Sequence, residues 1–398
     1  MQQAVLEHYP DVQVSYQFTN RGNHKFSQEL KKTISDAVKI FQYLELTAEE
    51  KQYLETLGFF KPQYLEYLKN YRFDPSQVKI ANLSRADCYT LDIKIEGPWH
   101  STILWEVPLM AAISELFYKK LDEQSPITGF HKKDEDEIAR KALVKADKLS
   151  MSQHRPEINP CLFAEFGTRR RRSSFVQETV LDALIERSNY AYLNRKTPGR
   201  RHLVGTSNVK LAMKKGIRPI GTMAHEWLMG VSALESLRYA NRYALYKWKD
   251  TYKADLGVAL TDTFGTPAFF RDFNLELAKV YDGVRHDSGD PITFGEAVID
   301  MYQRHGINPQ HKTIIFSDGL NPDKCIELHK HFYNKINVAF GIGTNLTNDF
   351  DDHKALNMVI KLRTVNDIPV VKLSDEPGKE TGDPKAIEVA KWTFGRTA

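Results

Sequence analysis

Cysteine is scarce in this 398-residue sequence, and the few cysteines form no recognisable motif. Cys88, Cys161 and Cys325 are odd in number and include no C-x-x-C pair. This pattern argues against a disulfide framework and against a structural zinc site. We therefore expect the protein to work in the cytoplasm, where thiols stay reduced.

Long apolar runs and a strong net charge are also lacking. No run approaches the roughly 18 residues of a membrane span, and the opening stretch "MQQAVLEHYP" has no basic region followed by an apolar core. The formal net charge is only +4 at pH 7, which is too mild for a dedicated nucleic-acid binder but suits a pocket for anionic small molecules. We expect neither a membrane nor a nucleic-acid partner.

Common nucleotide-binding and metal-binding signatures are missing as well. The sequence has no G-x-x-x-x-G-K-[ST] phosphate loop and no convincing G-x-G-x-x-G unit. P-loop kinases and standard dinucleotide oxidoreductases therefore fall in rank. The 13 histidines include no H-E-x-x-H motif, which counts against a barrel metal hydrolase built on clustered histidine ligands.

What the sequence does contain, from residue 160 onward, is a succession of short apolar runs that end in Gly, Ser, Thr, Asp or Arg. Stretches with helical spacing, such as "VQETVLDALIER" and "FGEAVIDMYQRHG", separate several of these runs. Buried strands that alternate with helices predict parallel pairing through right-handed crossovers. About eight such units in roughly 230 residues favour a (β/α) barrel, with an open doubly wound sheet as the alternative.

The start of the chain has a mixed character that predicts an N-terminal α+β domain. "DVQVSYQFTNR" alternates like a strand, and "PSQVKIANL" and "YTLDIKIEGPW" are typical of a strand pair. Thr47, with Glu50 three residues later, has a capping-box pattern. We place this domain at residues 1–135, with the C-terminal segment 360–398 as a candidate addition to it, and the barrel at residues 136–360.

The polar ends of the apolar runs form the candidate site, because a barrel places the carboxyl ends of its strands on one face. "FGTRRRR" supplies four consecutive arginines, and guanidinium groups bind phosphate or carboxylate bidentately. We expect at least one of them to be a ligand group and the others to be solvated or paired with neighbouring helices. The four are Arg169, Arg170, Arg171 and Arg172.

"VRHDSGDP" is the densest of these strand ends. Arg285, Asp287 and Asp290 flank a Ser-Gly pair. An arginine beside carboxylates can hold a phosphorylated sugar, with Arg on the phosphate and Asp on ribose hydroxyls or Mg²⁺. Asp290 has a second interpretation, as the N-cap of the helix that follows.

Other strand ends carry glycines and small polar residues. Glycine there lets backbone N–H groups approach a phosphate, although a tight turn explains a G-x-G-T pattern about as well. Many anion donors and a few carboxylates together suggest a phosphorylated sugar bound with Mg²⁺. The residues are Ser207 and Asn208 in "HLVGTSN", Asp318 and Gly319 in "FSDGLN", and Gly341, Gly343 and Thr344 in "GIGTNL".

A solitary histidine, His225, stands in "RPIGTMAHEWLMG" at the expected first turn of a helix. One interpretation is a structural histidine that is hydrogen-bonded near a strand end. Among phosphate-binding strand ends a second interpretation gains weight, since a neutral imidazole is a nucleophile toward a phosphoryl group. Glu226 is a candidate to orient the ring, but the adjacent residue of a helix points about 100° away, so another carboxylate is equally plausible.

These motifs together resemble bacterial nicotinate phosphoribosyltransferases, in the same order and from residue 1 to about residue 390. The segments that carry the resemblance include "GPWHSTILWEVPLMAAISE", "FAEFGTRRRRS", "VGTSN", "GTMAHEW", "LGVALTDTF", "VRHDSGDP", "IFSDGLN", "FGIGTNL", "NMVIKL" and "VVKLSDEPGK". The resemblance implies an α/β domain joined to an irregular (β/α) barrel, and homodimers with active sites at the subunit interface. It also implies synthesis of nicotinate mononucleotide and pyrophosphate from nicotinate and phosphoribosyl pyrophosphate in NAD salvage, with Mg²⁺ and with ATP hydrolysis coupled through a phosphohistidine.

The resemblance also implies roles for individual residues. His225 resembles the phospho-accepting histidine, and Phe166 resembles the aromatic residue that stacks on the pyridine ring. Asp287 resembles the acid near the ribose and the histidine. Glu226, the sequence neighbour of His225, stays a further catalytic candidate on the grounds given above. Arg169 and Arg285 resemble contacts to phosphate or to the nicotinate carboxylate, and the expected phosphate cradle is made of Asp318, Gly319, Gly341, Gly343 and Thr344.

Ser207 bears on the choice of pyridine. It matches the position where nicotinamide-using relatives carry Asp, which would accept a bond from a carboxamide N–H and repel a carboxylate; Ser207 therefore favours nicotinate. Family members are also expected to carry a D-x-Y-K segment ahead of "MQQAV", whose Tyr completes the ring sandwich across the dimer, and the printed sequence starts at Met1 of "MQQAV". Residues 189–202 are expected to form a surface loop insertion.

Three alternatives stay open at this point. Nicotinamide phosphoribosyltransferase shares the chemistry, and quinolinate phosphoribosyltransferase shares it with a second carboxylate site and release of CO₂. A non-enzymatic relative that kept the nucleotide pocket and lost turnover is the third.

Overall fold

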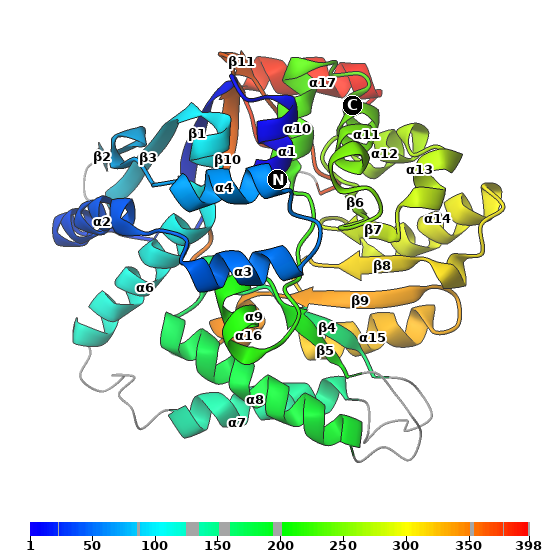
Figure 1. The fold of residues 1–398 in the computed structure, drawn as a ribbon, viewed down its shortest axis with the longest axis horizontal. Coiled ribbons are helices and arrows are strands. Elements are labelled where there is room, and N and C mark those ends of the chain that lie inside the picture. Colours follow the sequence, from blue (N-terminus) through cyan, green and yellow to red (C-terminus); the bar gives the residue numbers. More distant parts are fainter. Residues whose placement is uncertain are drawn as a thin grey trace. The chain divides into compact units, whose positions relative to one another are not determined.

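The computed structural model describes residues 1–22, 24–85, 88–124, 135–150, 160–193, 201–350, 354–376 and 378–396. The chain divides into two compact units. Unit 1 comprises Met1–Leu116, Thr222–Tyr281 and Leu356–Ala398, and unit 2 comprises Phe117–Gly221 and Asp282–Ala355. Figure 1 labels the elements of both units.

Unit 1 contains an antiparallel sheet and the helices of its three segments. Its strands lie in the order β11-β10-β1-β3-β2. The strands are β1 (Gln13–Asn20), β2 (Val78–Arg85), β3 (Cys88–Pro98), β10 (Met358–Val365) and β11 (Ile368–Pro369), with β6 (Val258–Leu260) in the middle segment. The helices are α1 (Gln2–His8), α2 (Gln28–Ile40), α3 (Ala48–Thr56), α4 (Pro62–Asn70), α5 (Trp99–Thr102), α10 (His225–Leu234), α11 (Ala240–Tyr252), α12 (Thr266–Asp272), α13 (Leu275–Val280) and α17 (Pro384–Phe394), and α6 (Glu106–Gln124) begins in this unit.

The sheet of unit 1 joins the two ends of the chain. Strand β1 pairs with β3 on one side and with β10 on the other, so that Val14 faces Val365 across the second pair. The alternation in β1 explains its place in the sheet, because Val14, Tyr16 and Phe18 are buried while the residues between them are less so. Residues 356–398 therefore lie in the same unit as the N-terminal segment.

Aromatic side chains fill the core of unit 1 between α5, α10 and α11. Trp99 and Trp227 stack with their ring centroids 6.0 Å apart, and Trp248 meets Trp227 edge-on at 6.1 Å. All three are essentially unexposed. Such large apolar surfaces hold α10 in place, and α10 also packs on β10. Through this packing residues 222–281 belong to unit 1, although the predicted barrel at residues 136–360 includes them.

Unit 2 contributes five strands to a six-stranded sheet, in the order β5-β4-β9-β8-β7. The pairs β4–β5, β4–β9, β8–β9 and β7–β8 are all parallel. Helix α8 contacts β5, and α15 contacts β9. The elements are α7 (Glu135–Leu149), β4 (Leu162–Glu165), α8 (Ser174–Leu193), β5 (Leu203–Thr206), α9 (Val209–Lys215), β7 (Gly283–His286), α14 (Pro291–Arg304), β8 (Thr313–Phe316), α15 (Pro322–Phe332), β9 (Asn337–Ile342) and α16 (Thr344–Thr347).

The predicted α/β fold class with an additional α+β part is confirmed. The strand pair β2–β3 and the parallel pairing of the later apolar runs also follow the prediction. No closed ring of strands is detected in the described ranges; the parallel strands form a sheet. Of the expected insertion at residues 189–202, helix α8 covers the part up to Leu193, and residues 194–200 lie outside the described residues.

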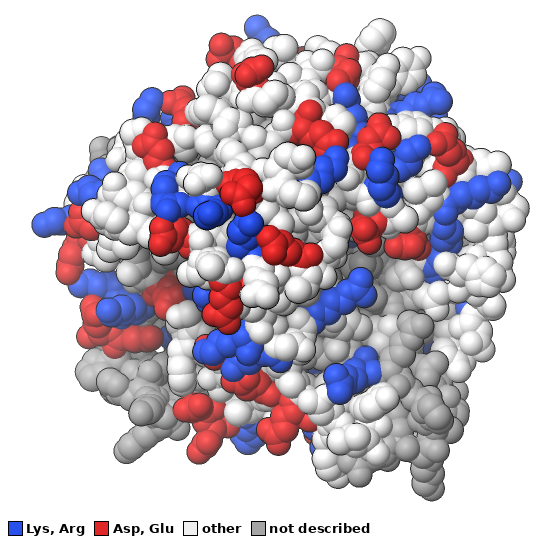
Figure 2. Space-filling view, in the orientation of Figure 1, with Lys and Arg blue, Asp and Glu red and all other residues white. Residues whose placement is uncertain are grey.

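Two local start signals are confirmed by their geometry. Thr47 and Glu50 form a complete capping box at α3, and the Asp290 carboxylate accepts a hydrogen bond from the Thr293 N–H at the start of α14. Among the described residues, no helix combines the length and apolarity needed to cross a bilayer. On the face shown in Figure 2, basic and acidic side chains are interspersed over the described surface, in line with the small net charge.

Candidate active site

Parallel pairing brings several predicted site residues of unit 2 to one edge of its sheet. The carboxyl ends of parallel strands share an edge, and ligands bind outside that edge in open α/β sheets. Phe166 and Arg169 follow β4, Ser207 follows β5, Asp287 follows β7, Asp318 and Gly319 follow β8, and Gly343 and Thr344 follow β9. Arg285 and Gly341 are each the second-last residue of their strands, β7 and β9.

Phe166 is held at this edge by backbone and steric contacts. Its N–H donates to the Ile342 carbonyl of β9 at 2.8 Å, and its ring lies against Gly341. A Cβ atom at position 341 would come within 2.6 Å of Phe166 Cδ2, which no real Cβ can do. Gly341 is therefore required by the Phe166 ring, in addition to any role in the predicted phosphate cradle.

Ser207 occupies the neighbouring strand end. Its N–H donates to the Glu165 carbonyl at 2.8 Å, while its side chain is exposed. Because Glu165 of β4 pairs with Thr206 of β5, Phe166 and Ser207 leave adjacent strands at the same level. A planar ligand that stacked on Phe166 would thus meet a small neutral side chain on the β5 side.

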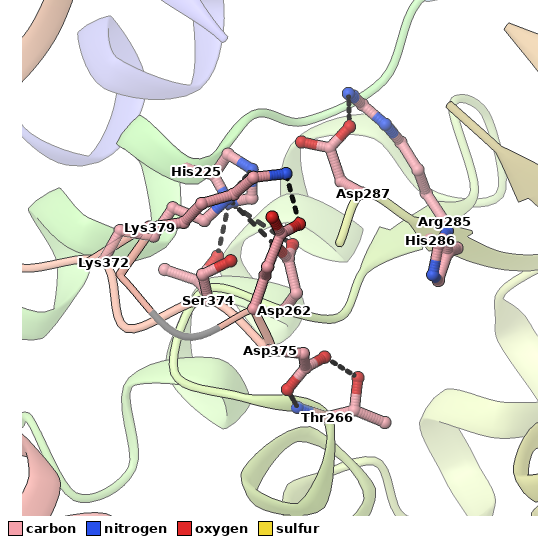
Figure 3. A network of polar contacts seen from close by, with 12 residues as sticks. His225, Asp262, Thr266, Arg285, His286, Asp287, Lys372, Ser374, Asp375 and Lys379 are labelled. Atoms are coloured by element: carbon pink, nitrogen blue, oxygen red, sulfur yellow. Dashed lines mark hydrogen bonds and ion pairs between the residues drawn. The ribbon is translucent and has the colours of Figure 1, made fainter. Parts of the chain in front are cut away.

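Arg285 and Asp287 form a compact polar group with Ser317. Arg285 donates through Nε to Ser317 Oγ at 2.8 Å and through NH2 to Asp287 Oδ1 at 2.9 Å. Ser317 Oγ lies 2.8 Å from the same carboxylate oxygen. Figure 3 shows the Arg285–Asp287 pair. The guanidinium and the carboxylate both lie at the end of β7, and Ser317 follows β8; a guanidinium of this kind can bind a phosphate.

The four consecutive arginines divide between structure and surface. Arg172 is buried, pairs with Asp122 at 2.7 Å, and lies over the Tyr118 ring at 4.4 Å. Arg171 donates to Gln177 Oε1 at 3.0 Å. Arg169 is the exposed member of the run and lies in a short 3₁₀ turn after β4. It is therefore the best placed of the four to meet a ligand.

In unit 1, His225 opens α10 and sits in a buried ionic cluster. Its Nδ1 lies 3.1 Å from Thr263 Oγ1 and 3.6 Å from Asp262 Oδ1, and its Nε2 lies 3.0 Å from Lys372 Nζ. Lys372 Nζ also lies 2.9 Å from Asp262 Oδ2. The side chains are 8%, 1% and 11% exposed for His225, Asp262 and Lys372 respectively. Figure 3 draws this cluster.

The neighbours of the imidazole assign its tautomer. An ammonium group has hydrogens to donate and no lone pair, so Nε2 beside Lys372 must be the acceptor. The ring proton then lies on Nδ1, where Thr263 Oγ1 and the Asp262 carboxylate can accept it. Nε2 is thus unprotonated beside a cation, and its lone pair could attack an anionic phosphoryl group once the hydrogen bond from Lys372 shifts.

Lys372 owes its position to a tightly bonded loop. Lys372 and Thr381 exchange two backbone hydrogen bonds, at 2.8 and 2.9 Å, and the Leu373 N–H donates to the Thr263 carbonyl at 2.7 Å. Asp375 accepts from both the N–H and the hydroxyl of Thr266. Ser374 between them has a φ of 63° and a buried hydroxyl. This strained position is compatible with a functional loop.

Glu226 does not serve as the orienting group of the imidazole. Its Oε1 accepts hydrogen bonds from the Tyr16 hydroxyl at 2.5 Å and from Trp99 Nε1 at 2.6 Å. The rotation of one residue along the helix turns it into the core. Burial raises the pKa of Glu226 to about 7, although both hydrogen bonds favour the ionised form. The sequence left open that another carboxylate orients the imidazole, and Asp262 is the carboxylate that lies near Nδ1, at 3.6 Å.

Sequence reasoning missed Asp262, Thr263 and Lys372 as individual site residues. Asp262 and Thr263 come just after β6, separated from it by Thr261, in "VALTDTF", and a polar residue after a strand is also the signal that singled out Asp287. Lys372 had no such signal, because its role depends on a contact with residues over a hundred positions away in the sequence. For a divalent cation, the strand-end carboxylates fit in kind: Asp287 and Asp318 in unit 2, and Asp262 in unit 1.

Comparisons with known proteins identify the family of the chain. Residues 161–398 match the model of the nicotinate phosphoribosyltransferase (NAPRTase) family, and residues 1–114 match that of its N-terminal domain. The nicotinate phosphoribosyltransferase of Methanosarcina acetivorans is 48% identical over 409 aligned residues, covering 100% of this chain and 95% of the relative. That of Escherichia coli is 41% identical over 388 residues, covering 97% of this chain and 90% of the relative.

Solved structures give the same result. The crystal structure of nicotinate phosphoribosyltransferase from Vibrio cholerae superposes with a TM-score of 0.90 at 35% identity, covering 100% of this chain and 92% of that one. The enzyme from Porphyromonas gingivalis gives a TM-score of 0.86 at 34% identity, covering 99% and 96%. With family models over both parts of its length and relatives aligned along all of it, the chain belongs to the nicotinate phosphoribosyltransferase family.

Proposed function

We propose that the protein is an ATP-coupled nicotinate phosphoribosyltransferase of NAD salvage. In the reaction, the nicotinate nitrogen attacks C1 of phosphoribosyl pyrophosphate, and the bond from C1 to the pyrophosphate oxygen breaks with its electron pair. The products are nicotinate mononucleotide and pyrophosphate. Family membership along the whole chain supports the transferase reaction, and the buried His225–Lys372–Asp262 cluster is the observation that carries the coupling to ATP.

The pyridine would stack on Phe166 and meet Ser207 at its edge. The absence of a side chain at Gly341 leaves room for the Phe166 ring. Ser207 offers a neutral hydroxyl where an acidic side chain would repel the carboxylate of nicotinate. Arg285 would bind phosphate or carboxylate oxygens while Asp287 accepts from ribose hydroxyls. These residues contribute binding and alignment, which is the main demand of a transfer that passes through an oxocarbenium-like state.

ATP coupling would proceed through His225. The lone pair on the ring nitrogen attacks the γ-phosphorus of ATP, the N–P bond forms, and the bond to the bridging oxygen breaks as ADP leaves. Lys372 lies beside that nitrogen and would balance the incoming negative charge. Water later cleaves the N–P bond to give phosphate and the free histidine. Phosphorylation would tighten binding of phosphoribosyl pyrophosphate, and dephosphorylation would help to release the product.

Three further features belong to the proposal. Mg²⁺ would neutralise the phosphates of ATP and phosphoribosyl pyrophosphate. It would be held by those phosphates together with a strand-end carboxylate, Asp262 in unit 1 or Asp287 or Asp318 in unit 2. The protein would act as a homodimer with active sites at the subunit interface. It would work in the cytoplasm, as its buried free thiols at Cys161 and Cys325 suggest.

The test is pyrophosphate release from nicotinate and phosphoribosyl pyrophosphate, with and without ATP. We expect ATP to stimulate the wild-type protein and to leave an acid-labile label on it from radiolabelled γ-phosphate. His225→Ala should lose both the stimulation and the label while keeping the uncoupled reaction, because the histidine does not attack the sugar. His311→Ala, which replaces an exposed histidine, is the matched control.

Three outcomes would overturn parts of the proposal. Full ATP stimulation of His225→Ala would refute the phosphohistidine. Faster turnover of nicotinamide than of nicotinate would favour the amide-using enzyme. Tight binding of nicotinate mononucleotide without any pyrophosphate release would indicate a relative that binds the nucleotide and does not turn over.

A further inference from the structure

Behind the predicted pyridine site of unit 2 lies a buried carboxylate that the proposed mechanism does not use. Glu165 is the last residue of β4 and is 0% exposed. Its side chain accepts hydrogen bonds from the Gly167 N–H, from Gln177 Nε2 at 2.9 Å and from Thr206 Oγ1 at 2.6 Å. The three donors come from the loop after β4, from α8 and from the end of β5. One carboxylate therefore ties together three segments of the chain.

Gln177 extends this connection with both ends of its amide. It is also 0% exposed. Besides Glu165, its Nε2 donates to Thr168 Oγ1 at 2.8 Å. Its Oε1 accepts from Arg171 NH1 at 3.0 Å and from Asn208 Nδ2 at 3.5 Å. Asn208 in turn caps α9. The pair Glu165–Gln177, called the carboxylate–amide latch below, thus contacts both loops that carry predicted pyridine ligands.

The energetics argue that the latch serves more than stability. Burying a carboxylate is expensive, and a well-packed apolar pair of similar volume is often as stable or more stable. Burial raises the pKa of Glu165, while its hydrogen bonds from Thr206, Gln177 and Gly167 oppose that shift. What the latch does provide is direction, since each hydrogen bond fixes one segment relative to the same two oxygens. Phe166 and Ser207 are the immediate neighbours of those fixed segments.

We propose that Glu165 and Gln177 are positioning residues that set the spacing between Phe166 and Ser207 and so determine how tightly nicotinate is bound. This inference rests on the proposed function for the identity of the ligand. Neither residue acts on the substrate itself; Glu165 and Gln177 act through the two loops. The latch is a fixed frame for the pyridine, and it has no part in the phosphorylation of His225.

The decisive variant is Gln177→Leu, which keeps the side-chain size and removes every hydrogen bond of the amide. The loss of these four hydrogen bonds predicts a rise in the KM for nicotinate of about tenfold. The kcat, the KM for phosphoribosyl pyrophosphate and the labelling of His225 from ATP should change less than about twofold. A purely structural role would instead lower all activities together as folded protein is lost. Gln177→Asn should raise the KM for nicotinate less than Gln177→Leu does, because it keeps the amide.

Ser188→Ala is the matched control on the same helix. Ser188 is buried in α8, and its Oγ accepts from the Leu203 N–H at 3.2 Å, at the other end of β5. It removes a buried hydrogen bond of the same unit without touching the latch. If Ser188→Ala raised the KM for nicotinate as much as Gln177→Leu did, the positioning role would be refuted.

Hydrogen–deuterium exchange separates this inference from the proposed function. Gln177→Leu should speed exchange in residues 166–172 and in residues 206–208 together, and Ser188→Ala should not. This holds whether or not the protein turns over nicotinate. An inactive wild-type protein would refute the proposed function alone, whereas unchanged exchange in both loops of Gln177→Leu would refute the latch.

Discussion

The two units support their candidate site residues in different ways: His225 in unit 1 has charged neighbours, and Phe166 in unit 2 follows a residue with neutral hydrogen-bond partners. His225 is flanked by a buried ion pair, Lys372 and Asp262, which places one charge of each sign beside the ring. Phe166 is backed by a carboxylate whose hydrogen bonds come from neutral donors, Gln177 and Thr206 among them. The contrast fits two tasks: receiving and releasing a phosphoryl group, and holding a flat ligand in one place.

The same comparison separates two buried glutamates that are sequence neighbours of site residues. Glu226 follows His225, and Glu165 precedes Phe166. Burial raises the pKa of both, and neither side chain is directed at the chemistry. A titratable residue beside a catalytic one is thus a weak guide to catalysis, because adjacent residues of a helix or a strand point to different surroundings.

Removing the cation beside His225 is the change with the largest expected effect, and it would break the comparison if it failed. Lys372→Met takes away the charge that faces Nε2 and leaves Asp262 buried without its ion pair. We expect ATP-dependent labelling of His225 to slow by about 10²–10³-fold, as when one preorganised charge-stabilising donor is lost. Quench-flow labelling with ATP measures this. Lys391→Met, which breaks a surface ion pair with Glu380, is the control, and equal labelling rates in both variants would contradict the assignment.

The pH dependence of stability sharpens the contrast between Glu226 and an ordinary surface carboxyl. Burial raises the pKa of Glu226 to about 7 in the folded protein, above its ordinary value of 4.5. The folded state therefore holds this proton longer, so the group's contribution is most favourable below pH 4.5 and is lost as the pH rises through 7. The full difference is about 3 kcal/mol.

Glu226→Gln should flatten this dependence, because the amide oxygen still accepts from Tyr16 and Trp99 and never ionises. Urea denaturation at several pH values should show the variant gaining up to about 3 kcal/mol on the wild type between pH 5 and pH 8. Glu49→Gln, at an exposed position in the first turn of α3, should follow the wild-type profile. A Glu226→Gln curve parallel to that of the wild type would show that the group is ionised throughout.

Filling the space under Phe166 tests the rigid side of the comparison. Gly341→Ala places a Cβ where the Phe166 ring now lies, 2.6 Å from Cδ2. Overpacking of this kind costs about 1–3 kcal/mol, and here it is relieved by moving the ring. We expect the KM for nicotinate to rise about tenfold while labelling of His225 is unchanged. Gly306→Ala is a poor control because its φ is 67°, so Ala339→Gly, on the same strand, is preferred. A KM for nicotinate in Gly341→Ala equal to that of the wild type would mean that the Phe166 ring does not contact the pyridine.

Local signals in the sequence were enough to predict the strand ends, and tertiary contacts were needed for what surrounds them. The apolar run before Phe166 and the "VRHDSGDP" segment place their polar residues by simple continuation of a parallel strand. The partners Lys372 and Gln177 are different, because each acts through a contact that no spacing rule encodes. Assignment of residues 222–281 likewise depended on Trp227 packing with Trp99, which a strand-and-helix alternation does not reveal.

The smallest expected effect concerns Asp290, where the sequence left a ligand and a helix cap as alternatives. Its carboxylate accepts from the Thr293 N–H at 2.7 Å and is exposed, and that backbone hydrogen bond, first among the causes, lowers the pKa of Asp290. Asp290→Ala should cost about 1 kcal/mol of unfolding free energy, as loss of an N-cap does, and Asp290→Asn or Asp290→Ser should recover most of it. Neither kcat nor any KM should change. A loss of affinity for phosphoribosyl pyrophosphate in Asp290→Ser would instead place this carboxylate with Arg285 and Asp287 as a ligand group. Charged neighbours would then support a site residue in unit 2 as they do at His225 in unit 1.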